Sequence, residues 1–302
     1  DRPSSARSDR AGSALSEAWK VSFRAAITSS PRCENDVVYF GCRDGHLYAY
    51  GADGKLRWRY RASGGIGASP LVMDERVICA DYGGNLFCLK AKSGEPLWTL
   101  PLRAKIVSSP VAGGDRLFIA TTDGRVVAAR LRDGKRLWSR KIGVSIRSTV
   151  AVGKDFVVAA TTDGSLQKLG ADGTVAWKVE VGGEILSSPI VLEETGVVVV
   201  GAPNRSVQAR SLATGALAWK RATDAPVTGS PVFDGGVIYV GTRGGTVYAL
   251  APDGAERWRA DAGGAVFSKP AVAAGTIFIT TYGRELLALD AGGTKLEQLT
   301  RC

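Results

Sequence analysis

The sequence predicts an all-β protein, a seven-bladed β-propeller of four-stranded antiparallel blades. The first observation is spacing: Trp19, Trp58, Trp98, Trp138, Trp177, Trp219 and Trp258 follow one another at intervals of 39, 40, 40, 39, 42 and 39 residues. The second observation is the content of one period, which holds four short β-rich runs separated by Gly- or Asp-rich turns. A repeat of this length and content is typical of blades arranged around an axis.

The stretch from Val227 to Trp258 shows the four elements of one repeat in order. The runs VTGSPVF, VIYVGT, TVYAL and AERW alternate with the turns DGG, RGG and APDG. No helical periodicity interrupts them, so each repeat is expected to be an antiparallel meander. Asp-Gly or Gly-Gly pairs at hairpin tips supply the positive φ angles of two-residue turns, at Asp44-Gly45, Gly83-Gly84, Asp123-Gly124, Asp163-Gly164 and Gly244-Gly245.

A Ser-Pro pair or a variant of it marks the innermost strand of each blade, which gives seven inner strands. Because Trp19 precedes the first of them, we expect the N-terminal strand EAWKVSF to supply the outer strand of the last blade and close the ring. The alternatives are that residues 294–299 fill this place and the N-terminal strand is additional, or that the ring has eight blades. Residues 1–14 are expected to be a flexible lead-in and residues 15–302 a single propeller domain.

The end of each repeat, a glycine followed by a variable stretch and tryptophan, resembles the tryptophan-docking motif of the PQQ-like (quinoprotein-type) propeller family. GADGKLRW, RDGKRLW and APDGAERW are examples, and the resemblance spans residues 19–297. It implies that all seven tryptophans are structural and pack between neighbouring blades. Within the family the chain is most similar to the non-catalytic, BamB-like propellers of the outer membrane. The adjacent cysteine pair of the quinone-dependent alcohol dehydrogenases is absent from the sequence.

Catalytic, metal and cofactor chemistry is not indicated by the sequence. His46 is the only histidine and follows a hairpin tip, which makes it a poor base for a Ser-His-Asp or Cys-His hydrolase. The cysteines lack paired C-x-x-C spacing, and no P-loop is found. We therefore expect a non-enzymatic protein with no cofactor and no metal.

The cysteines raise the question of a disulfide in the second blade. If the Gly-Gly turn of that blade holds two residues, Cys79 and Cys88 face each other in a non-hydrogen-bonded pair, close enough for a disulfide in an oxidising compartment. The alternative is two small buried apolar side chains. Cys33 is expected to face Val38, which places Cys42 about 13 Å further along the ladder and disfavours a Cys33–Cys42 bond.

The turns of each repeat differ in the sign of the charged residues that they carry. In an up-and-down meander the second turn of each blade and the linkers between blades lie on one side of the disc, and these segments are rich in arginine. The first and third turns lie on the other side and are rich in acidic residues. We expect a basic face that docks an acidic protein partner. The candidate partner-binding residues are Arg43, Arg125, Arg147, Arg205, Arg243, Arg284 and Lys269.

The family resemblance implies a non-enzymatic interaction scaffold of the bacterial cell envelope, which we expect to be a monomer. Its expected place is the periplasm or another extracytoplasmic site, at or near the outer membrane, with an envelope or outer-membrane assembly complex as partner. The alternative is a propeller that binds a ligand or quinone as a sensor or an enzyme. Nucleic-acid binding ranks below both because no base-reading or base-stacking module is present.

Overall fold

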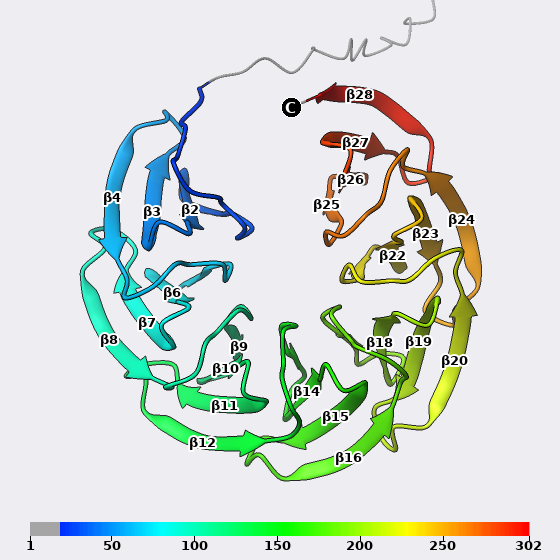
Figure 1. Ribbon diagram of the computed structural model, residues 1–302, viewed down its shortest axis with the longest axis horizontal. Coiled ribbons are helices and arrows are strands. Elements are labelled where there is room, and N and C mark those ends of the chain that lie inside the picture. The colour runs from blue at the N-terminus through cyan, green and yellow to red at the C-terminus, as the bar shows by residue number, and fades with distance from the viewer. Residues whose placement is uncertain (1–18, 302) are drawn as a thin grey trace, which may run out of the picture.

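The computed structural model describes residues 19–301 and confirms the predicted all-β, seven-bladed propeller. Its 28 strands form seven four-stranded sheets, and within each sheet every strand pairs antiparallel with its sequence neighbour. The sheets are arranged radially, with the first strand of each innermost and the fourth at the rim (Figure 1). Residues 19–301 include no helix with the length and hydropathy needed to cross a membrane.

The strands of the first four blades have the following bounds. Blade one contains β1 (Arg32–Glu34), β2 (Val37–Gly41), β3 (His46–Gly51) and β4 (Leu56–Arg61). Blade two contains β5 (Leu71–Met73), β6 (Arg76–Ala80), β7 (Asn85–Lys90) and β8 (Pro96–Pro101). Blade three contains β9 (Val111–Gly113), β10 (Arg116–Ala120), β11 (Arg125–Arg130) and β12 (Arg136–Lys141). Blade four contains β13 (Ala151–Val152), β14 (Phe156–Ala160), β15 (Ser165–Gly170) and β16 (Val175–Glu180).

The remaining three blades repeat this plan. Blade five contains β17 (Ile190–Leu192), β18 (Val197–Ala202), β19 (Ser206–Ser211) and β20 (Leu217–Ala222). Blade six contains β21 (Val232–Asp234), β22 (Val237–Gly241), β23 (Thr246–Leu250) and β24 (Glu256–Asp261). Blade seven contains β25 (Ala271–Ala273), β26 (Thr276–Thr280), β27 (Glu285–Leu289) and β28 (Lys295–Arg301).

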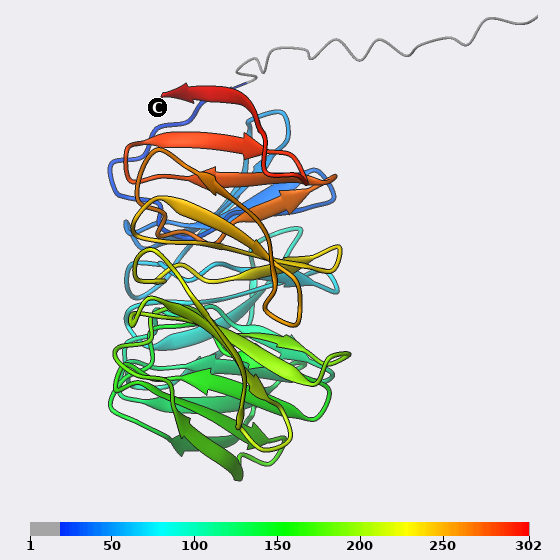
Figure 2. The ribbon, with the colours of Figure 1, turned by 90° about the vertical axis from the view of Figure 1, so that its right-hand side faces the viewer.

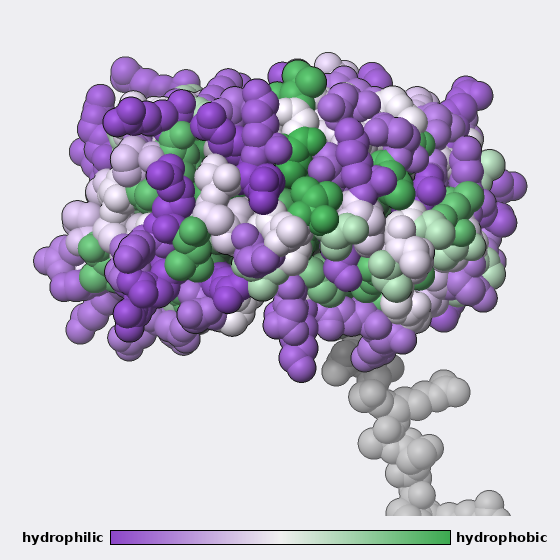
Figure 3. All heavy atoms as spheres, turned by 90° about the horizontal axis from the view of Figure 1, so that it is seen from below, coloured by the Kyte–Doolittle hydropathy of each residue, from purple (hydrophilic) through white to green (hydrophobic). Residues whose placement is uncertain are grey.

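The core lies between blades, on both faces of the second and third strands. In β18 all six residues are buried, because side chains that alternate across a strand meet a neighbouring blade on either side. The fourth strands are half exposed, and in every blade except the sixth they carry an exposed aliphatic residue, as at Leu97, Leu137 and Leu217. Figure 2 shows the turns gathered at the two sides of the disc, and Figure 3 shows apolar patches on the rim between hydrophilic margins.

The tryptophans join each blade to the next by one repeated contact. The indole Nε1–H of Trp58 donates to the Ala91 carbonyl at 2.7 Å, and that of Trp138 donates to the Ala171 carbonyl at 2.8 Å, in both cases 33 residues further along the chain. The indole ring lies on the glycine of the third turn of the next blade: a Cβ on Gly94 would stand 2.7 Å from the Trp58 ring. This is the interblade position that the family resemblance implies.

The second turns differ from the predicted two-residue form. The Cys42 amide donates to the His46 carbonyl and the Gly45 amide to the Cys42 carbonyl, which leaves three residues between the closing pair. Only the last of the three has a positive φ, 88° at Gly45 and 87° at Gly84. This is the three-residue turn that ends in a left-handed residue, and Asp-Gly and Gly-Gly sequences suit it as well as they suit a two-residue turn.

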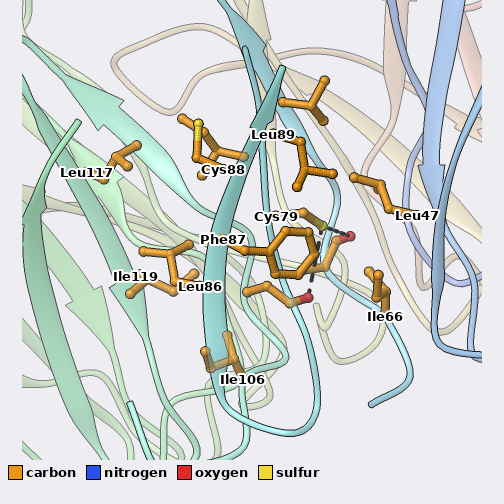
Figure 4. Packing of buried hydrophobic residues seen from close by; sticks show 14 of the residues in the cluster. Leu47, Ile66, Cys79, Leu86, Phe87, Cys88, Leu89, Ile106, Leu117 and Ile119 are labelled. Atoms are coloured by element: carbon orange, nitrogen blue, oxygen red, sulfur yellow. Dashed lines mark hydrogen bonds between the residues drawn. The ribbon is translucent and has the colours of Figure 1, made fainter. Parts of the chain in front are cut away.

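This turn length moves the register of blade two by one residue, so the possible Cys79–Cys88 disulfide does not form, and the alternative of two small buried side chains is correct. Cys79 pairs with Phe87, and Cys88 pairs with Ile78, so the two sulfur atoms lie on opposite faces of the sheet. Figure 4 shows Cys79 on the side of Leu47 in blade one, with Cys88 on the other side of the sheet. Both thiols are free and fully buried.

The register of the first hairpin agrees with the prediction. Cys33 pairs with Val38, and Asn35 and Asp36 both have positive φ, at 49° and 59°, as a two-residue turn of this kind requires. Cys33 is exposed and Cys42 is buried, and both are free thiols.

The predicted closure of the ring by the N-terminal strand was wrong. The fourth strand of blade seven is β28, which pairs with β27, so the C-terminal segment occupies the place assigned to EAWKVSF. Among the described residues, 19–31 form no strand. Trp19 nevertheless donates to the Ala52 carbonyl of blade one at 2.8 Å, in the same way as the other tryptophans. The whole of the predicted lead-in, residues 1–14, lies outside the described residues.

Thiol chemistry tests the register of blade two. Burial raises the pKa of Cys79 to about 12 and that of Cys88 to about 11, so neither is a thiolate near neutral pH. Iodoacetamide at pH 8 should therefore modify exposed Cys33 and leave both buried thiols unmodified until the protein unfolds. Peptide mapping by mass spectrometry measures this, and a Cys79–Cys88 disulfide found without reductant would contradict the register.

A pair of glycine variants tests the tryptophan contact. Gly134→Ala places a Cβ 2.4 Å from the Trp98 ring at a φ of 69°, whereas Gly114→Ala, at a φ of 61°, meets no atom within 4 Å. In both variants an alanine in the left-handed conformation lowers the free energy of unfolding by about 1–2 kcal/mol. Only in Gly134→Ala does overpacking against the ring lower it by a further amount of about 1–3 kcal/mol. Urea unfolding should show the larger loss for Gly134→Ala; equal losses would mean that the ring contact carries no strain.

Candidate partner-binding face

Backbone hydrogen bonds assign each turn to one of two faces. The second turn of a blade is bonded to the linker before it, as where the Arg43 amide donates to the Ala26 carbonyl, and to the linker after it, as where the Ala62 amide donates to the Gly45 carbonyl. We call this side, made of second turns and linkers, the linker face. The first and third turns meet on the opposite face, where the Ala52 amide donates to the Asp36 carbonyl.

The linker face carries the arginines singled out in the sequence. They are spread over second turns and linkers around the ring and do not form a single cluster. Six arginine side chains and Lys269 are exposed: Arg43, Arg125, Arg147, Arg205, Arg243, Arg284 and Lys269.

Aromatic rings organise part of this surface. The guanidinium of Arg43 lies 5.9 Å from the centre of the Tyr82 ring, and the ammonium of Lys105 lies 4.6 Å from the same ring. Arg243 lies 5.3 Å from the centre of the Phe267 ring. Each ring steadies a cation by its quadrupole while leaving the donors of the cation free for a partner. Tyr82, Lys105 and Phe267 are therefore additional members of the face that sorting charges by turn did not identify.

Two of the arginines occupy strained backbone positions. Arg205 and Arg284 have φ values of 57° and 64°, at the turn position that glycine occupies in the other five blades, as at Gly45. Arg103, in a linker, has a φ of 57°. A residue with a side chain pays about 1–2 kcal/mol for this conformation, and such strain is typical of positions kept for function. Among the described residues, every non-glycine residue with positive φ on the linker face is an arginine.

Acidic residues also lie on the linker face, in the second turns themselves. Their carboxylates fold back onto their own turns: Asp44 accepts from the Tyr48 hydroxyl at 2.7 Å, and Asp81 accepts from the Ser63 hydroxyl at 2.9 Å. Asp163 accepts from the Thr161 hydroxyl, which lowers the pKa of this carboxyl. The prediction from the sequence counted only the arginines of the second turns and did not include these carboxylates. Because they are occupied within the turns, the outward charge of the second turns comes mainly from arginine.

The ion pairs of the face are few. Arg125 contacts Asp123 at 3.0 Å. Among the described side chains, those of residues 19–296, no carboxylate lies within 4 Å of Arg147, Arg205 or Arg284. These three guanidinium groups are the ones most available to an outside carboxylate.

Lys269 lies where a chain of hydrogen bonds near the axis stops. The Ser30 amide donates to the Ser69 hydroxyl at 2.8 Å, and the same bond runs from blade to blade through Ser109, Thr149 and Ser188 as far as Ser230. Blade seven has Lys269 at this position and no hydroxyl. Although the residue as a whole is exposed, partial desolvation of its ammonium by burial and, secondarily, the charge of Arg32 lower the pKa of Lys269. Lys269 therefore lies at the inner edge of blade seven, away from the arginines of the second turns.

The described residues show no arrangement with catalytic geometry. The single histidine, His46, lies 3.4 Å from Asp44 at the edge of a turn. No group of three or more His, Cys, Asp or Glu side chains that could hold a metal ion is found among the described residues. A recess of about 540 Å³ between blades two and three is lined by Arg103, Arg125 and Arg136, which extends the basic surface toward the rim.

One known protein family matches nearly the whole length of this chain. Three overlapping regions of the chain, residues 10–145, 132–226 and 203–296, match the family described as outer membrane protein assembly factor BamB. The chain belongs to the BamB family. The matched regions contain all seven tryptophans of the repeat.

Individual BamB proteins are distant relatives. BamB of Shewanella oneidensis is 34% identical over 90 residues, which are 28% of this chain and 22% of that protein. BamB of Burkholderia pseudomallei is 26% identical over 88 residues, 29% of this chain and 23% of that protein. The aligned stretch thus spans less than a quarter of the BamB relatives.

Solved structures share the fold over a much larger part. BamB from Moraxella catarrhalis superposes with a TM-score of 0.73 at 24% identity, covering 91% of this chain and 86% of that one. The computationally designed Ika8 protein superposes with a TM-score of 0.81 at 17% identity, covering 91% and 87%. The designed protein matches the backbone as well as the natural BamB does, so these similarities establish the fold alone.

Replacing the strained arginines with glycine tests whether they are kept at the expense of stability. Arg205→Gly and Arg284→Gly should each raise the free energy of unfolding by up to about 1 kcal/mol, because glycine adopts positive φ freely. Arg125→Gly is the matched control: it lies next to a second turn but without positive φ, and it should stabilise nothing. Thermal unfolding compares the three, and equal shifts in all of them would remove the argument from strain.

Proposed function

We propose that this protein is a non-enzymatic scaffold of the bacterial cell envelope that uses its linker face to bind an acidic surface of a partner protein. Membership of a family named for outer membrane protein assembly supports the setting, and an assembly complex of that kind is the proposed partner. The proposed location is the periplasm, at or near the outer membrane, and the proposed state is a monomer.

The observation that carries the proposal is the pair of arginines held at left-handed positions. A turn selected for stability alone would have glycine there, as five blades do. Arg205 and Arg284 are exposed and have no carboxylate within 4 Å among the described side chains, so binding a partner replaces water and breaks none of the described ion pairs.

The spacing of the charges around the ring indicates how the face recognises its partner. Exposed arginines on separate blades give a broad positive potential, which raises the rate of encounter with an acidic surface and excludes basic ones. The formal net charge of +10 reinforces this field over the whole molecule. Recognition of this kind weakens as salt rises, because counterions screen exposed charges beyond about 8 Å at physiological ionic strength.

Charge reversal on one face at a time tests the proposal. The variant Arg205→Glu, Arg243→Glu, Arg284→Glu should weaken capture of outer-membrane assembly subunits at least about tenfold, with most of the loss at low salt. The measurement is affinity capture from detergent-solubilised native envelopes, quantified by mass spectrometry over a series of salt concentrations.

The matched control carries the same change in net charge on the opposite face. Lys55, Lys92 and Arg132 are exposed in third turns, and their replacement by glutamate should leave capture unchanged. Equal losses in both variants would show that net charge and not the linker face decides binding. Unchanged capture in the first variant would overturn the proposal.

A further inference from the structure

The interface between blades two and three contains a recess lined by three arginines. Its volume is about 540 Å³, and residues 100–102 line it together with Arg103, Arg125 and Arg136. Arg103 lies in the linker between the blades, Arg125 begins β11, and Arg136 begins β12. We call this the arginine recess. Blades two and three each have a neighbouring blade on both sides (Figure 1), so the recess does not depend on either end of the chain.

In two other interfaces a hydrogen bond joins the linker to the third strand of the blade that follows. Before blade two, the Asn85 side-chain amide donates to the Ser63 hydroxyl at 2.6 Å. Before blade six, the Thr246 hydroxyl donates to the Asp224 carboxylate at 3.0 Å. In both cases the two residues are 22 positions apart, and the second is the first residue of the third strand. This pair of positions therefore closes the interface by a donor and an acceptor.

Before blade three the same two positions hold Arg103 and Arg125, which have the same spacing. A guanidinium group has N–H donors and no acceptor, so two of them cannot hydrogen bond to each other. Asp123 contacts Arg125 at 3.0 Å, but its other oxygen accepts from the Thr121 hydroxyl. Among the described side chains no carboxylate lies within 4 Å of Arg103. An anion between the two arginines would supply the acceptor that this interface lacks.

A second pair of positions in the same interface also lacks its acidic partner. Between blades five and six, Arg221 on β20 forms an ion pair with Glu256 on β24. These residues lie two positions after the tryptophan of one blade and two positions before the tryptophan of the next. Between blades two and three the residues at these positions are Leu100 and Arg136. Arg136 has no carboxylate within 4 Å among the described side chains.

The backbone conformation of Arg103 is a third sign that its side chain is kept for a contact. Its φ is 57°, in the left-handed region that disfavours residues with a side chain. In the linkers before blades five and seven the residue at this place is glycine, with a φ of 101° at Gly182 and 78° at Gly263. The turn itself therefore favours glycine, and strain of this kind is typical of positions kept for function.

The chemistry of the arginine recess favours phosphate over carboxylate. A phosphate group carries up to about two negative charges and three acceptor oxygens, so it can accept from two guanidinium groups at once. A carboxylate has one charge and two oxygens, and a single arginine occupies both. Leu100 and Leu102 add apolar surface beside the cations, which suits the uncharged part of an organic phosphate. The volume of the recess is that of a small-molecule site.

We propose that the arginine recess is a binding site for a phosphate-bearing ligand, whose phosphate group is held between Arg103 and Arg125. The uncharged part of the ligand lies on Leu100 and Leu102, and Arg136 adds positive charge to the same recess. A soluble organic phosphate and the headgroup of an anionic phospholipid share this chemistry. The site is separate from the proposed docking of an acidic protein on the linker face, and Arg125 is the only residue common to both.

Binding of defined phosphates to the full chain tests the proposal. Titration calorimetry with inorganic phosphate and with glycerol 3-phosphate should show saturable binding, whereas glycerol should not bind. Sedimentation with phosphatidylcholine vesicles, with and without phosphatidic acid, identifies the source of the phosphate. Binding of glycerol 3-phosphate without sedimentation indicates a soluble ligand. Sedimentation only with vesicles that contain phosphatidic acid indicates a phospholipid.

Two recess variants, each with a matched control, locate the binding. Arg103→Gly and Arg136→Gln should each weaken phosphate binding at least about tenfold, because each removes a charged donor group from the recess. Arg103→Gly also removes the left-handed side chain, so it should unfold at the same or a higher temperature and its loss of binding cannot be due to unfolding. Arg205→Gly removes the same charge and the same kind of strain elsewhere, and Arg257→Gln removes an exposed cation from β24; both should bind phosphate normally.

Three outcomes would overturn the proposal. One is that the unmodified chain binds none of the phosphate probes. Another is an equal loss of binding in Arg103→Gly and Arg205→Gly, which would assign the binding to net charge. The third is tighter binding of a hexaglutamate peptide than of either phosphate, lost in Arg103→Gly, which would assign the recess to an acidic protein. The Arg205→Glu, Arg243→Glu, Arg284→Glu variant keeps all three recess arginines, so the two proposals can fail independently.

Discussion

The docking of one tryptophan per blade onto the next blade is the contact on which the rest of this structure depends. The indole donates to a turn carbonyl, and its ring lies on a glycine whose positive φ excludes a side chain. Each sheet alone has two apolar faces and cannot bury them, so the fold exists only through its interfaces. Each blade must present the same carbonyl and the same glycine to its neighbour. The sequence therefore repeats with a period of about 40 residues.

Because the tryptophan contact fixes the outer part of each blade, variation is left to the turns and the termini. The linker face shows how such variation is used. Its second turns keep a common backbone path while glycine is exchanged for Arg205 and Arg284, and their aspartates are held by hydroxyl and amide donors within the turn. A surface with a basic outer charge is thus built on a scaffold that does not change. Membership of the BamB family supports the proposed setting of this surface. The solved structures have low sequence identity to this chain and therefore support only the fold.

The same interfaces explain why the two ends of the chain stand out. Every blade except the first and the last is covered on both faces by another blade. Blade one is covered by residues that include Trp19 and Phe23, and blade seven is left with Phe278 and Leu286 open. The N-terminal segment behaves as one strand of a blade in its side-chain contact but not in its backbone pairing.

The sequence by itself determined the fold class, the number of blades, the Cys33–Val38 pairing and the assignment of turns to faces. These follow from spacing and alternation, which are local properties that a repeated sequence states many times. The tertiary structure alone decided the register of blade two, the strand that completes blade seven and the fate of the turn aspartates. Asp-Gly and Gly-Gly sequences fit both two- and three-residue turns, and one residue of difference sends Cys79 and Cys88 to opposite faces. Likewise EAWKVSF and the C-terminal strand have equally suitable patterns for the last place in the ring, and only the pairing of backbone groups in space chose between them.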